Sequence, residues 1–232
     1  MKFLALIQAR MGSSRLPGKV LRPARGRPML SYLIERLRRA EMLSDIVVAT
    51  TRDSVDDAIE DWCRSEGAAC VRGEVNDVAA RLLAVAEGLG AERFVRVSGD
   101  SPLLDPALVE EGCRLMAAES WDLVTNVFPR SFPTGQSVEV VRTAALRAIL
   151  HEASVEEREH VTLFFYRNAQ RFRIRNFAAP ADWSYCRLAV DTADDFAELE
   201  RLLDAMSGEH AAYGLADLVA LAADRARTAP HG

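Results

Sequence analysis

The sequence predicts an α/β fold in which a mostly parallel β-sheet is flanked by helices. Two observations support this prediction. Short apolar runs alternate with segments of helical spacing from Phe3 to Thr125, and parallel strands need helical crossovers of this kind. The runs themselves are largely uninterrupted by polar residues, as expected of strands that are buried on both faces.

The first half of the chain reads as five strands separated by four helices. The strands are expected over Phe3–Ala9, Ile46–Thr50, Ala69–Val71, Phe94–Ser98 and Leu123–Thr125. The helices are expected from Pro28, from Asp53 or Ser54 to about Glu66, over Asp77–Leu89, and from Pro106 to about Glu119. Pro28 and Pro106 suit first turns, where a missing N–H costs nothing. Gly67 ends the second helix, and Asn76 is expected to cap the third.

The second half is less regular. Further strands are expected over Ser137–Val141, Phe172–Phe177 and Arg187–Val190. Helices are expected over Thr143–Leu150, Glu156–Arg167, Thr192–Met206 and Leu215–Ala226. Because no repeat or linker interrupts the chain, residues 1–227 are predicted to form one domain with a small appended lobe, and residues 228–232 a loose tail.

Composition excludes several classes of partner. The 232 residues carry a net charge of −5 at a pI of about 5.5, which argues against general nucleic-acid binding. The apolar run at the N-terminus is short and is followed by Arg10, so it reads as a strand rather than a signal peptide, and no run is long enough to span a membrane. The four cysteines lack metal-site spacing. A cytoplasmic location is therefore expected.

The most informative stretch is the polar loop from Arg10 to Lys19, directly after the first strand. Open α/β sheets bind ligands at this edge. The loop places Arg10, Arg15 and Lys19 within ten residues of an acidic chain, next to Gly12 and two small hydroxyl residues, Ser13 and Ser14. Backbone N–H groups beside small residues can approach a phosphate closely. The loop is therefore interpreted as a cradle for a polyphosphate.

Two other phosphate-binding motifs do not fit this loop. A Walker A loop needs four residues between its glycines and a Ser or Thr after the Lys, whereas five residues separate Gly12 from Gly18 and Val20 follows Lys19. A dinucleotide fingerprint needs a third glycine and an immediate helix, and the loop has neither. The remaining alternative is a solvated basic loop.

Asp100 and Asp191 each follow an apolar strand-like run. Carboxylates at strand ends converge on the ligand crevice of an α/β sheet, and Mg²⁺ typically takes one or two of them together with substrate phosphates. The two residues are therefore predicted to bind Mg²⁺. The alternatives are a helix N-cap for Asp191 and a turn residue before Pro102 for Asp100.

Three further segments carry polar candidates. Arg72, Asp77 and Arg81 follow the third strand, where contact with a base or ribose and a plain helix cap are equally plausible. The segment from Glu157 to Thr162 contains His160, which could contact a hydroxylated substrate or be structural. The turn from Pro133 to Val140 leads into a strand and is well placed for substrate contact without being diagnostic.

Residues 8–21 strongly resemble the N-terminal signature of CMP-sugar synthetases, the cytidylyltransferases that include the spore coat polysaccharide biosynthesis protein F group. Similar stretches recur in family order at residues 48–51, 71–77, 98–102, 157–161 and 190–192. The resemblance implies a Rossmann-like nucleotidyltransferase fold, CTP as a substrate, Mg²⁺ and a homodimer. One departure concerns the acceptor side, because Ser137 stands where the group commonly has an acidic residue.

The resemblance also implies roles for individual residues. The implied catalytic residues are Arg10, Arg15, Lys19 and Asp100, and the implied metal ligands are Asp100 and Asp191. The predicted nucleotide contacts are Gln8, Ala9, Arg10, Gly12, Ser13, Ser14, Lys19, Thr50, Arg72, Asp77, Arg81, Ser98 and Gly99. The predicted acceptor contacts are Gln136, Glu139, Glu157 and His160.

The predicted function is Mg²⁺-dependent transfer of CMP from CTP to a sugar or related small acceptor, with release of pyrophosphate, in surface polysaccharide or glycoconjugate synthesis. A nucleotidyltransferase of other base specificity fits the basic loop equally well. A glycosyltransferase of similar fold would favour an Asp-x-Asp motif, which the Gly99-Asp100-Ser101 sequence lacks. A non-catalytic nucleotide-binding module is the third alternative.

Overall fold

The structure of the protein is a computed structural model that describes residues 2–228, with side chains as far as Asp224. The expected loose tail therefore lies outside the described residues, apart from Thr228, which ends the last helix. None of the described helices is long and apolar enough to cross a bilayer.

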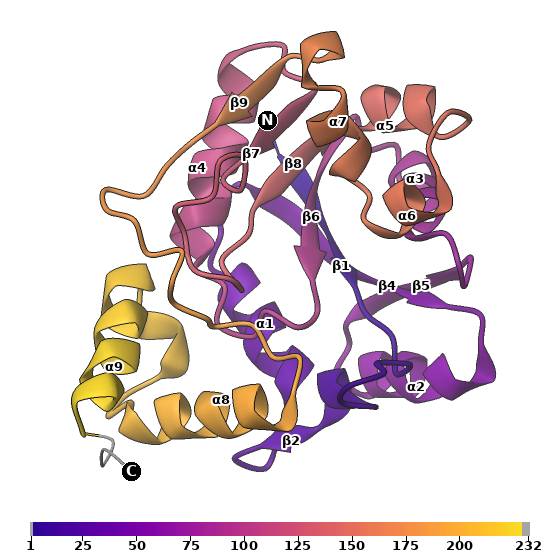
Figure 1. The fold of residues 1–232 in the computed structure, drawn as a ribbon. Coiled ribbons are helices and arrows are strands. Elements are labelled where there is room, and N and C mark those ends of the chain that lie inside the picture. The colour runs from indigo at the N-terminus through magenta and orange to yellow at the C-terminus, as the bar shows by residue number, and fades with distance from the viewer. Residues whose placement is uncertain (1, 229–232) are drawn as a thin grey trace.

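The centre of the described chain is a seven-stranded sheet with the order β5-β4-β1-β6-β8-β7-β9 (Figure 1). Its strands are β1 (Phe3–Gln8), β4 (Leu43–Thr51), β5 (Ala69–Gly73), β6 (Arg93–Ser98), β7 (Leu123–Thr125), β8 (Glu139–Arg142) and β9 (Ile174–Asn176). Only β8 of these strands runs antiparallel to its neighbours, β6 and β7. The predicted mostly parallel α/β sheet is confirmed.

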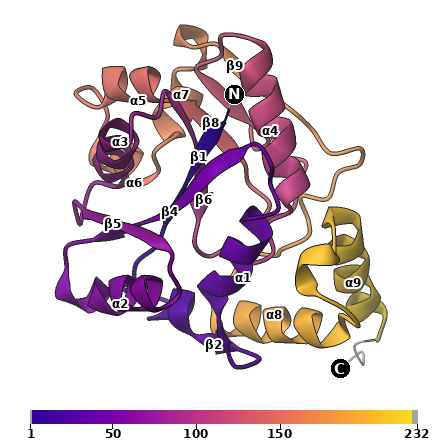
Figure 2. The same cartoon turned by 180° about the vertical axis from the view of Figure 1, so that it is seen from behind.

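Helices cover both faces of the sheet, as Figures 1 and 2 show. The helices are α1 (Met29–Leu37), α2 (Asp57–Ser65), α3 (Val78–Gly88), α4 (Pro106–Ala118), α5 (Thr143–Ile149), α6 (Val155–Glu159), α7 (Leu163–Arg167), α8 (Ala193–Ala205) and α9 (Leu215–Thr228). Alternate residues of β1 face opposite layers: Ile7 packs in the core with α1 and α4, whereas Leu6 packs with α3 and α5. This double burial explains why the strands are apolar throughout.

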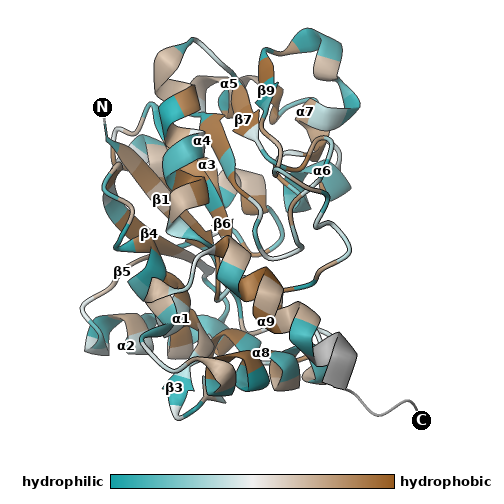
Figure 3. Cartoon of the chain, turned by 90° about the vertical axis from the view of Figure 1, so that its left-hand side faces the viewer, coloured by the Kyte–Doolittle hydropathy of each residue, from teal (hydrophilic) through white to brown (hydrophobic). Residues whose placement is uncertain are grey.

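The C-terminal helices α8 and α9 form the appended lobe, seen beside α1 in Figure 3. Fully buried Arg36 of α1 joins this lobe to the loop after β6. Its guanidinium donates to the carbonyl oxygens of Leu104 (2.9 Å), His210 and Tyr213 (2.7 Å). Beside it, His210 Nε2 lies 2.9 Å from the Glu35 carboxylate. Among the described residues, the hydrogen bonds of this arginine all go to carbonyl groups, and they tie the lobe to the loop after β6.

Local helix signals were largely confirmed, with one change of cap. Asp53 caps the short 3₁₀ turn that leads into α2, and Gly67 follows that helix at a φ of 64°. Asp105 caps α4, with Pro106 in its first turn. The prediction that Asn76 caps α3 is wrong, because the Asp77 side chain accepts the N–H of Ala80 at 2.8 Å.

Two predicted elements in the second half are wrong. The helix over Glu156–Arg167 is two short helices, α6 and α7, because the chain turns at Val161, whose φ is 28° and whose side chain is fully buried. The expected strand over Arg187–Val190 makes one isolated bridge, to Thr134. It lies across the end of the sheet instead, where the N–H of Val190 donates to the carbonyl of Asp100 at 2.8 Å.

Candidate nucleotide and metal site

A polar cleft of about 390 Å³ opens at the carboxyl ends of β1 and β6. It is lined by Gln8, Ala9, Arg10, Ser13, Ser14, Arg15, Lys19, Val20, Val78, Arg81, Arg96, Ser98, Gly99, Asp100, Glu159, His160 and Asp191. A larger cavity of about 810 Å³ lies near the amino end of β6, lined by residues such as Glu87 and Arg147, and contains none of the predicted site residues. The chemistry points to the smaller cleft.

The loop after β1 is held in a fixed fold. The N–H of Met11 donates to Asp56 Oδ1 at 2.7 Å, and Asp56 also accepts the hydroxyl of Thr51. Gly18 adopts a φ of 71°, which lets its N–H return to the carbonyl of Met11 at 2.9 Å and directs the chain into the turn that starts at Lys19. This fold leaves the loop cations at the cleft while its apolar residues pack inward.

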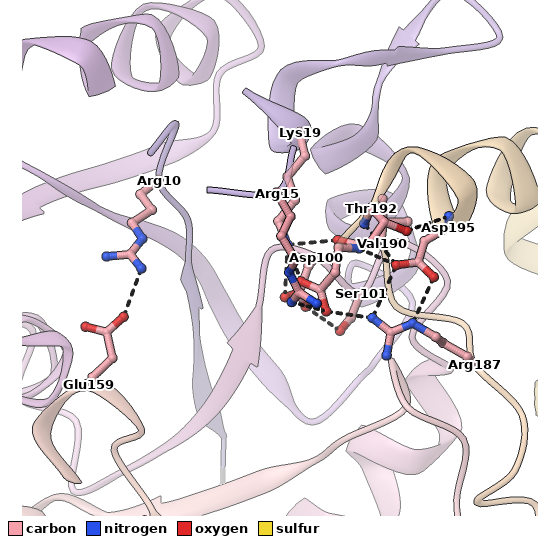
Figure 4. A network of polar contacts seen from close by, with 11 residues as sticks. Arg10, Arg15, Lys19, Asp100, Ser101, Glu159, Arg187, Val190, Thr192 and Asp195 are labelled. Atoms are coloured by element: carbon pink, nitrogen blue, oxygen red, sulfur yellow. Dashed lines mark hydrogen bonds and ion pairs between the residues drawn. The ribbon is translucent and has the colours of Figure 1, made fainter. Parts of the chain in front are cut away.

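Lys19 joins the two predicted metal ligands. Its ammonium lies 2.8 Å from Asp191 Oδ1, 3.4 Å from Asp100 Oδ2 and 2.8 Å from the carbonyl of Val190. Figure 4 shows the side chain reaching towards Asp100 and Val190. Asp100 Oδ1 accepts the hydroxyl of Ser101 at 3.1 Å. The structure therefore brings Lys19 together with Asp100, which is 81 positions away in the sequence, and with Asp191, which is 172 positions away.

Three cations surround Asp191. Besides Lys19, Arg15 lies 3.2 Å and Arg187 2.6 Å from its Oδ2 atom. Partial burial by itself would raise the pKa of Asp191, but Lys19, Arg187 and Arg15 outweigh it and hold that pKa below its ordinary value. Arg187 also pairs with Asp195, the residue that completes the capping box of α8, and the pKa of Asp195 falls to about 2. Asp191 is thus kept ionised. The helix cap expected as its alternative role is made by Thr192.

Arg10 lies on the other side of the cleft from the Lys19 cluster, as Figure 4 shows. It pairs with Glu159 at the end of α6, with a separation of 3.0 Å. Nearby Arg81 is 2% exposed and donates to the carbonyl of Glu74. Burial lowers the pKa of Arg81, and the positive charge of Arg10 lowers it further. His160, the residue after Glu159, also lines the cleft.

Arg96 forms part of the cleft lining and was missed in the sequence analysis. It donates to Gln8 Oε1 at 3.0 Å and to the carboxylate of Glu139. Glu139 is 4% exposed and also accepts the hydroxyls of Thr162 and Tyr166, each at 2.6 Å. Burial alone would raise the pKa of Glu139, but Arg96 and the two hydroxyls lower it overall. An arginine between two buried valines of a strand, Val95 and Val97, was the available signal.

Several predicted contact residues do not line the cleft. Arg72 donates to the carbonyls of Thr51 and Asp53 and pairs with Glu60, so its guanidinium braces β5 against α2. Asp77 caps α3 and pairs with Arg158. Arg72 lies in β5, the edge strand of the sheet, and Asp77 lies between β5 and α3, so the side chains of both are used in structural contacts there.

The predicted acceptor contacts Gln136 and Glu157 are also used structurally. Gln136 is fully buried; its Oε1 accepts the N–H of Asp105 at 2.8 Å, and its Nε2 donates to the carbonyl of Leu103 at 2.7 Å. It therefore holds the loop that follows Asp100. Glu157 completes a capping box at the start of α6. Glu139 lies behind Arg96 rather than among the lining residues.

Two smaller residues also lie outside the lining of the cleft. Thr50 is fully buried, and its hydroxyl has no hydrogen-bond partner among the described residues. Gly12 is exposed in the loop, with nothing within 4 Å of the position that a Cβ atom would take. Gly99, in contrast, lies under the cleft, where a Cβ atom would be 3.0 Å from the carbonyl oxygen of Gln8. Only Gly99 of the two has a packing reason to be glycine.

The donor set at Asp100 and Asp191 fits a magnesium ion. Both residues supply carboxylate oxygens, the ligands that Mg²⁺ prefers, and both have an oxygen near one nitrogen atom, Lys19 Nζ. The described residues contain no cluster of three or more His, Cys, Asp or Glu side chains suited to a metal. Two protein carboxylates suit an ion that keeps waters and phosphate oxygens as its other ligands.

Comparisons with known proteins agree with this geometry. A family model described as Cytidylyltransferase matches residues 4–213. The spore coat polysaccharide biosynthesis protein SpsF of Bacillus subtilis is 31% identical over 227 residues, covering 94% of this chain and 92% of that protein. The 3-deoxy-manno-octulosonate cytidylyltransferase of Geobacter sulfurreducens is 38% identical over 118 residues, covering 50% of this chain and 46% of that protein. A solved cytidylyltransferase structure from Leptospira borgpetersenii has a TM-score of 0.92 at 28% identity, covering 98% of this chain and 96% of that one.

Proposed function

We propose that this chain, which belongs to the cytidylyltransferase family, transfers CMP from CTP to a small acceptor and releases pyrophosphate. Family membership makes the protein a nucleotidyltransferase with the corresponding fold. The observation that carries the rest of the proposal is the meeting of Lys19, Asp100 and Asp191 in one polar cleft. A lysine from the phosphate-cradle loop and two carboxylates, Asp100 after β6 and Asp191 before α8, are the groups needed to bind a triphosphate together with its metal.

In the proposed reaction, an oxygen of the acceptor attacks the α-phosphorus of CTP. The new phosphorus–oxygen bond forms as the bond to the bridging oxygen of the β-phosphate breaks. Arg15 and Lys19 are proposed to bind the β- and γ-phosphates and to stabilise the negative charge of departing pyrophosphate. Arg10 would approach the nucleotide from the opposite side, after its contact with Glu159 is exchanged for a phosphate oxygen.

Asp100 and Asp191 are proposed to hold Mg²⁺, which would neutralise phosphate charge and orient the reacting groups. The chain's own contribution is to fix the two carboxylates. The N–H of Val190 donates to the carbonyl of Asp100, and Gln136 holds the loop after Asp100 through Leu103 and Asp105. Preorganised carboxylates of this kind need no rearrangement of the backbone when the ligands bind.

The acceptor is proposed to be a sugar or a related small molecule used in surface polysaccharide synthesis. The name of the SpsF relative and the polar residues of the cleft lining, such as Arg96 and His160, support this part of the proposal. The proposal also includes a homodimer and a cytoplasmic location. Four free cysteines, three of them buried, suit a reducing compartment.

The test is release of pyrophosphate from CTP and Mg²⁺ across a panel of acidic, amino and neutral sugars and polyols. CTP should be preferred over UTP, GTP and ATP with at least one acceptor. Binding of CTP without pyrophosphate release from any acceptor would refute transfer. Preference for another nucleotide would refute the assignment of the base. A parallel assay with the Asp100→Asn variant controls for contaminating activity.

A further inference from the structure

The ammonium of Lys19 is saturated by its three acceptors. An ammonium group has three donors, and here they point at Val190 O, Asp191 Oδ1 and Asp100 Oδ2. The side chain is only 10% exposed. Its backbone begins a 3₁₀ turn in which the neighbouring Val20 is buried in the core, so the ammonium can move only by rotation of the side chain.

The ammonium contacts the same two carboxylates that would bind a divalent ion. An ion bound by both carboxylates would lie about 2.0–2.1 Å from one oxygen of each. Lys19 Nζ already lies against both carboxylates, at 2.8 Å from Asp191 Oδ1 and 3.4 Å from Asp100 Oδ2. A divalent ion at that distance from these oxygens would lie close to the ammonium, and the two positive charges would repel each other strongly in a partly buried site. The lysine must therefore leave before the metal can bind.

A displaced Lys19 could not simply move to the other carboxylate oxygen of Asp191. The second oxygen of that residue is already held by Arg15 and Arg187. Ser13, Ser14 and Arg15 of the same loop line the same cleft, where they are suited to bind a phosphate chain. The oxygens of such a phosphate chain would be new acceptors for the Lys19 ammonium. A bound triphosphate would thus accept the lysine and release the metal ligands.

We propose that Lys19 acts as the resident counter-ion of the metal site in the nucleotide-free enzyme, so that metal binds tightly only together with nucleotide. The inference rests on the proposed function in so far as Mg²⁺ and a triphosphate are the ligands of this cleft. Because coupling between two ligands is reciprocal, metal strengthens nucleotide binding by the same factor. Lys19 is thereby both a phosphate ligand and a barrier to metal binding in the absence of nucleotide.

The test is a titration of the protein with Mn²⁺ in the absence of nucleotide. Electron paramagnetic resonance measures the concentration of free Mn²⁺ at each step. Lys19→Met should bind Mn²⁺ about 30-fold more tightly than the wild type, a factor within the usual range of site–site coupling. Lys19→Gln, which keeps a donor for the Val190 carbonyl, is the second variant in case Lys19→Met does not fold. Thermal unfolding shows whether each of the two variants is folded.

Arg15→Gln is the matched control. It removes the same charge from Asp191, but the Arg15 side chain is 62% exposed and its contact is 3.2 Å long. Its effect on Mn²⁺ affinity should be about threefold or less, as for exposed ion pairs generally. Unchanged or weaker Mn²⁺ binding in both Lys19 variants would overturn the inference. Equal tightening in Lys19→Met and Arg15→Gln would also overturn it, because net charge alone would then explain the result.

The experiment separates this inference from the proposed function. Tighter Mn²⁺ binding in the Lys19 variants is measured without CTP or acceptor, so it would stand even if no acceptor released pyrophosphate. Conversely, an active wild-type enzyme whose Lys19 variants bind Mn²⁺ no more tightly would retain its function and lose the counter-ion role.

Discussion

Breaking the buried ion pair between Arg96 and Glu139 is expected to destabilise the whole domain. The Glu139 carboxylate is 4% exposed and depends on Arg96 for its only cationic hydrogen-bond partner among the described residues. Arg96→Met leaves that carboxylate buried without its cation, which typically costs about 3–5 kcal/mol. A domain of this kind has a total unfolding free energy of about 5–15 kcal/mol, so the loss is a large fraction of it.

Urea unfolding at pH 7 measures this cost. Arg96→Met and Glu139→Leu should each lower the unfolding free energy, and the double variant should lower it by about 2 kcal/mol less than the two single changes together. Tyr166→Phe is the control, since it removes one hydroxyl donor to Glu139 at a cost of about 1 kcal/mol. If the losses of unfolding free energy in the two single variants add up to the loss in the double variant, Arg96 and Glu139 do not stabilise each other. The ion pair would then not explain the position of Arg96 in the cleft.

The same pair predicts a pH dependence with a definite sign. The pKa of Glu139 in the folded protein lies below its ordinary value of 4.5. Folding therefore gains stability from this group above about pH 4.5, and the gain is lost as the pH falls through the lower, folded pKa. In urea unfolding between pH 7 and pH 3, the wild type should lose more stability than the double variant. If the unfolding free energies of the wild type and the double variant fall in parallel with pH, the pKa of Glu139 is not lowered by folding.

Three further changes test other parts of the structure. Asp100→Asn should lower the rate of pyrophosphate release by at least about 10² in a coupled assay, and near-normal release would remove Asp100 from the metal site. Gln136→Leu should cost about 2 kcal/mol or more in urea unfolding, because it leaves two buried backbone groups without partners; a cost below 0.5 kcal/mol would contradict the bracing role. Burial lowers the pKa of His210 below 6.5 despite the opposing charge of Glu35, so the wild-type melting temperature should fall below about pH 6.5 more steeply than that of His210→Gln. Equal slopes would show that His210 titrates normally.

The local pattern of the sequence was enough to predict most of the first half of the fold. The strand over Leu123–Thr125 has the predicted bounds, and β1 ends one residue before its predicted end. Proline, glycine and capping residues act on their own turns, so their effect is visible without tertiary contacts. Val161 shows the limit of this reasoning, because a continuous helical pattern was interrupted to bury that side chain and to bring Thr162 to Glu139.

The residues of the candidate site also fall into those that local sequence could predict and those that depend on tertiary contacts. Composition and spacing predicted the basic loop and the aspartate after β6, since residue type and position after a strand are local properties. Asp191 was predicted from a strand over Arg187–Val190 that does not form, although the residue does reach the cleft. Whether Gln136 meets a ligand or a backbone carbonyl depends on what lies across from it, and only the folded chain places it against Leu103 and Asp105. Arg96 was missed for the same reason, because Glu139 lies 43 residues away.

By itself, the sequence determined the layered α/β plan, the cationic loop and the aspartate that follows β6, because each follows from hydrophobic periodicity and residue chemistry over a few positions. The tertiary structure alone decided which of these groups meet. It reversed β8 against its neighbours, laid the segment before Asp191 across the end of the sheet, and placed the Lys19 ammonium between two carboxylates far away in the chain. Contacts of such long sequence separation depend on how whole elements pack, and no local pattern records that packing.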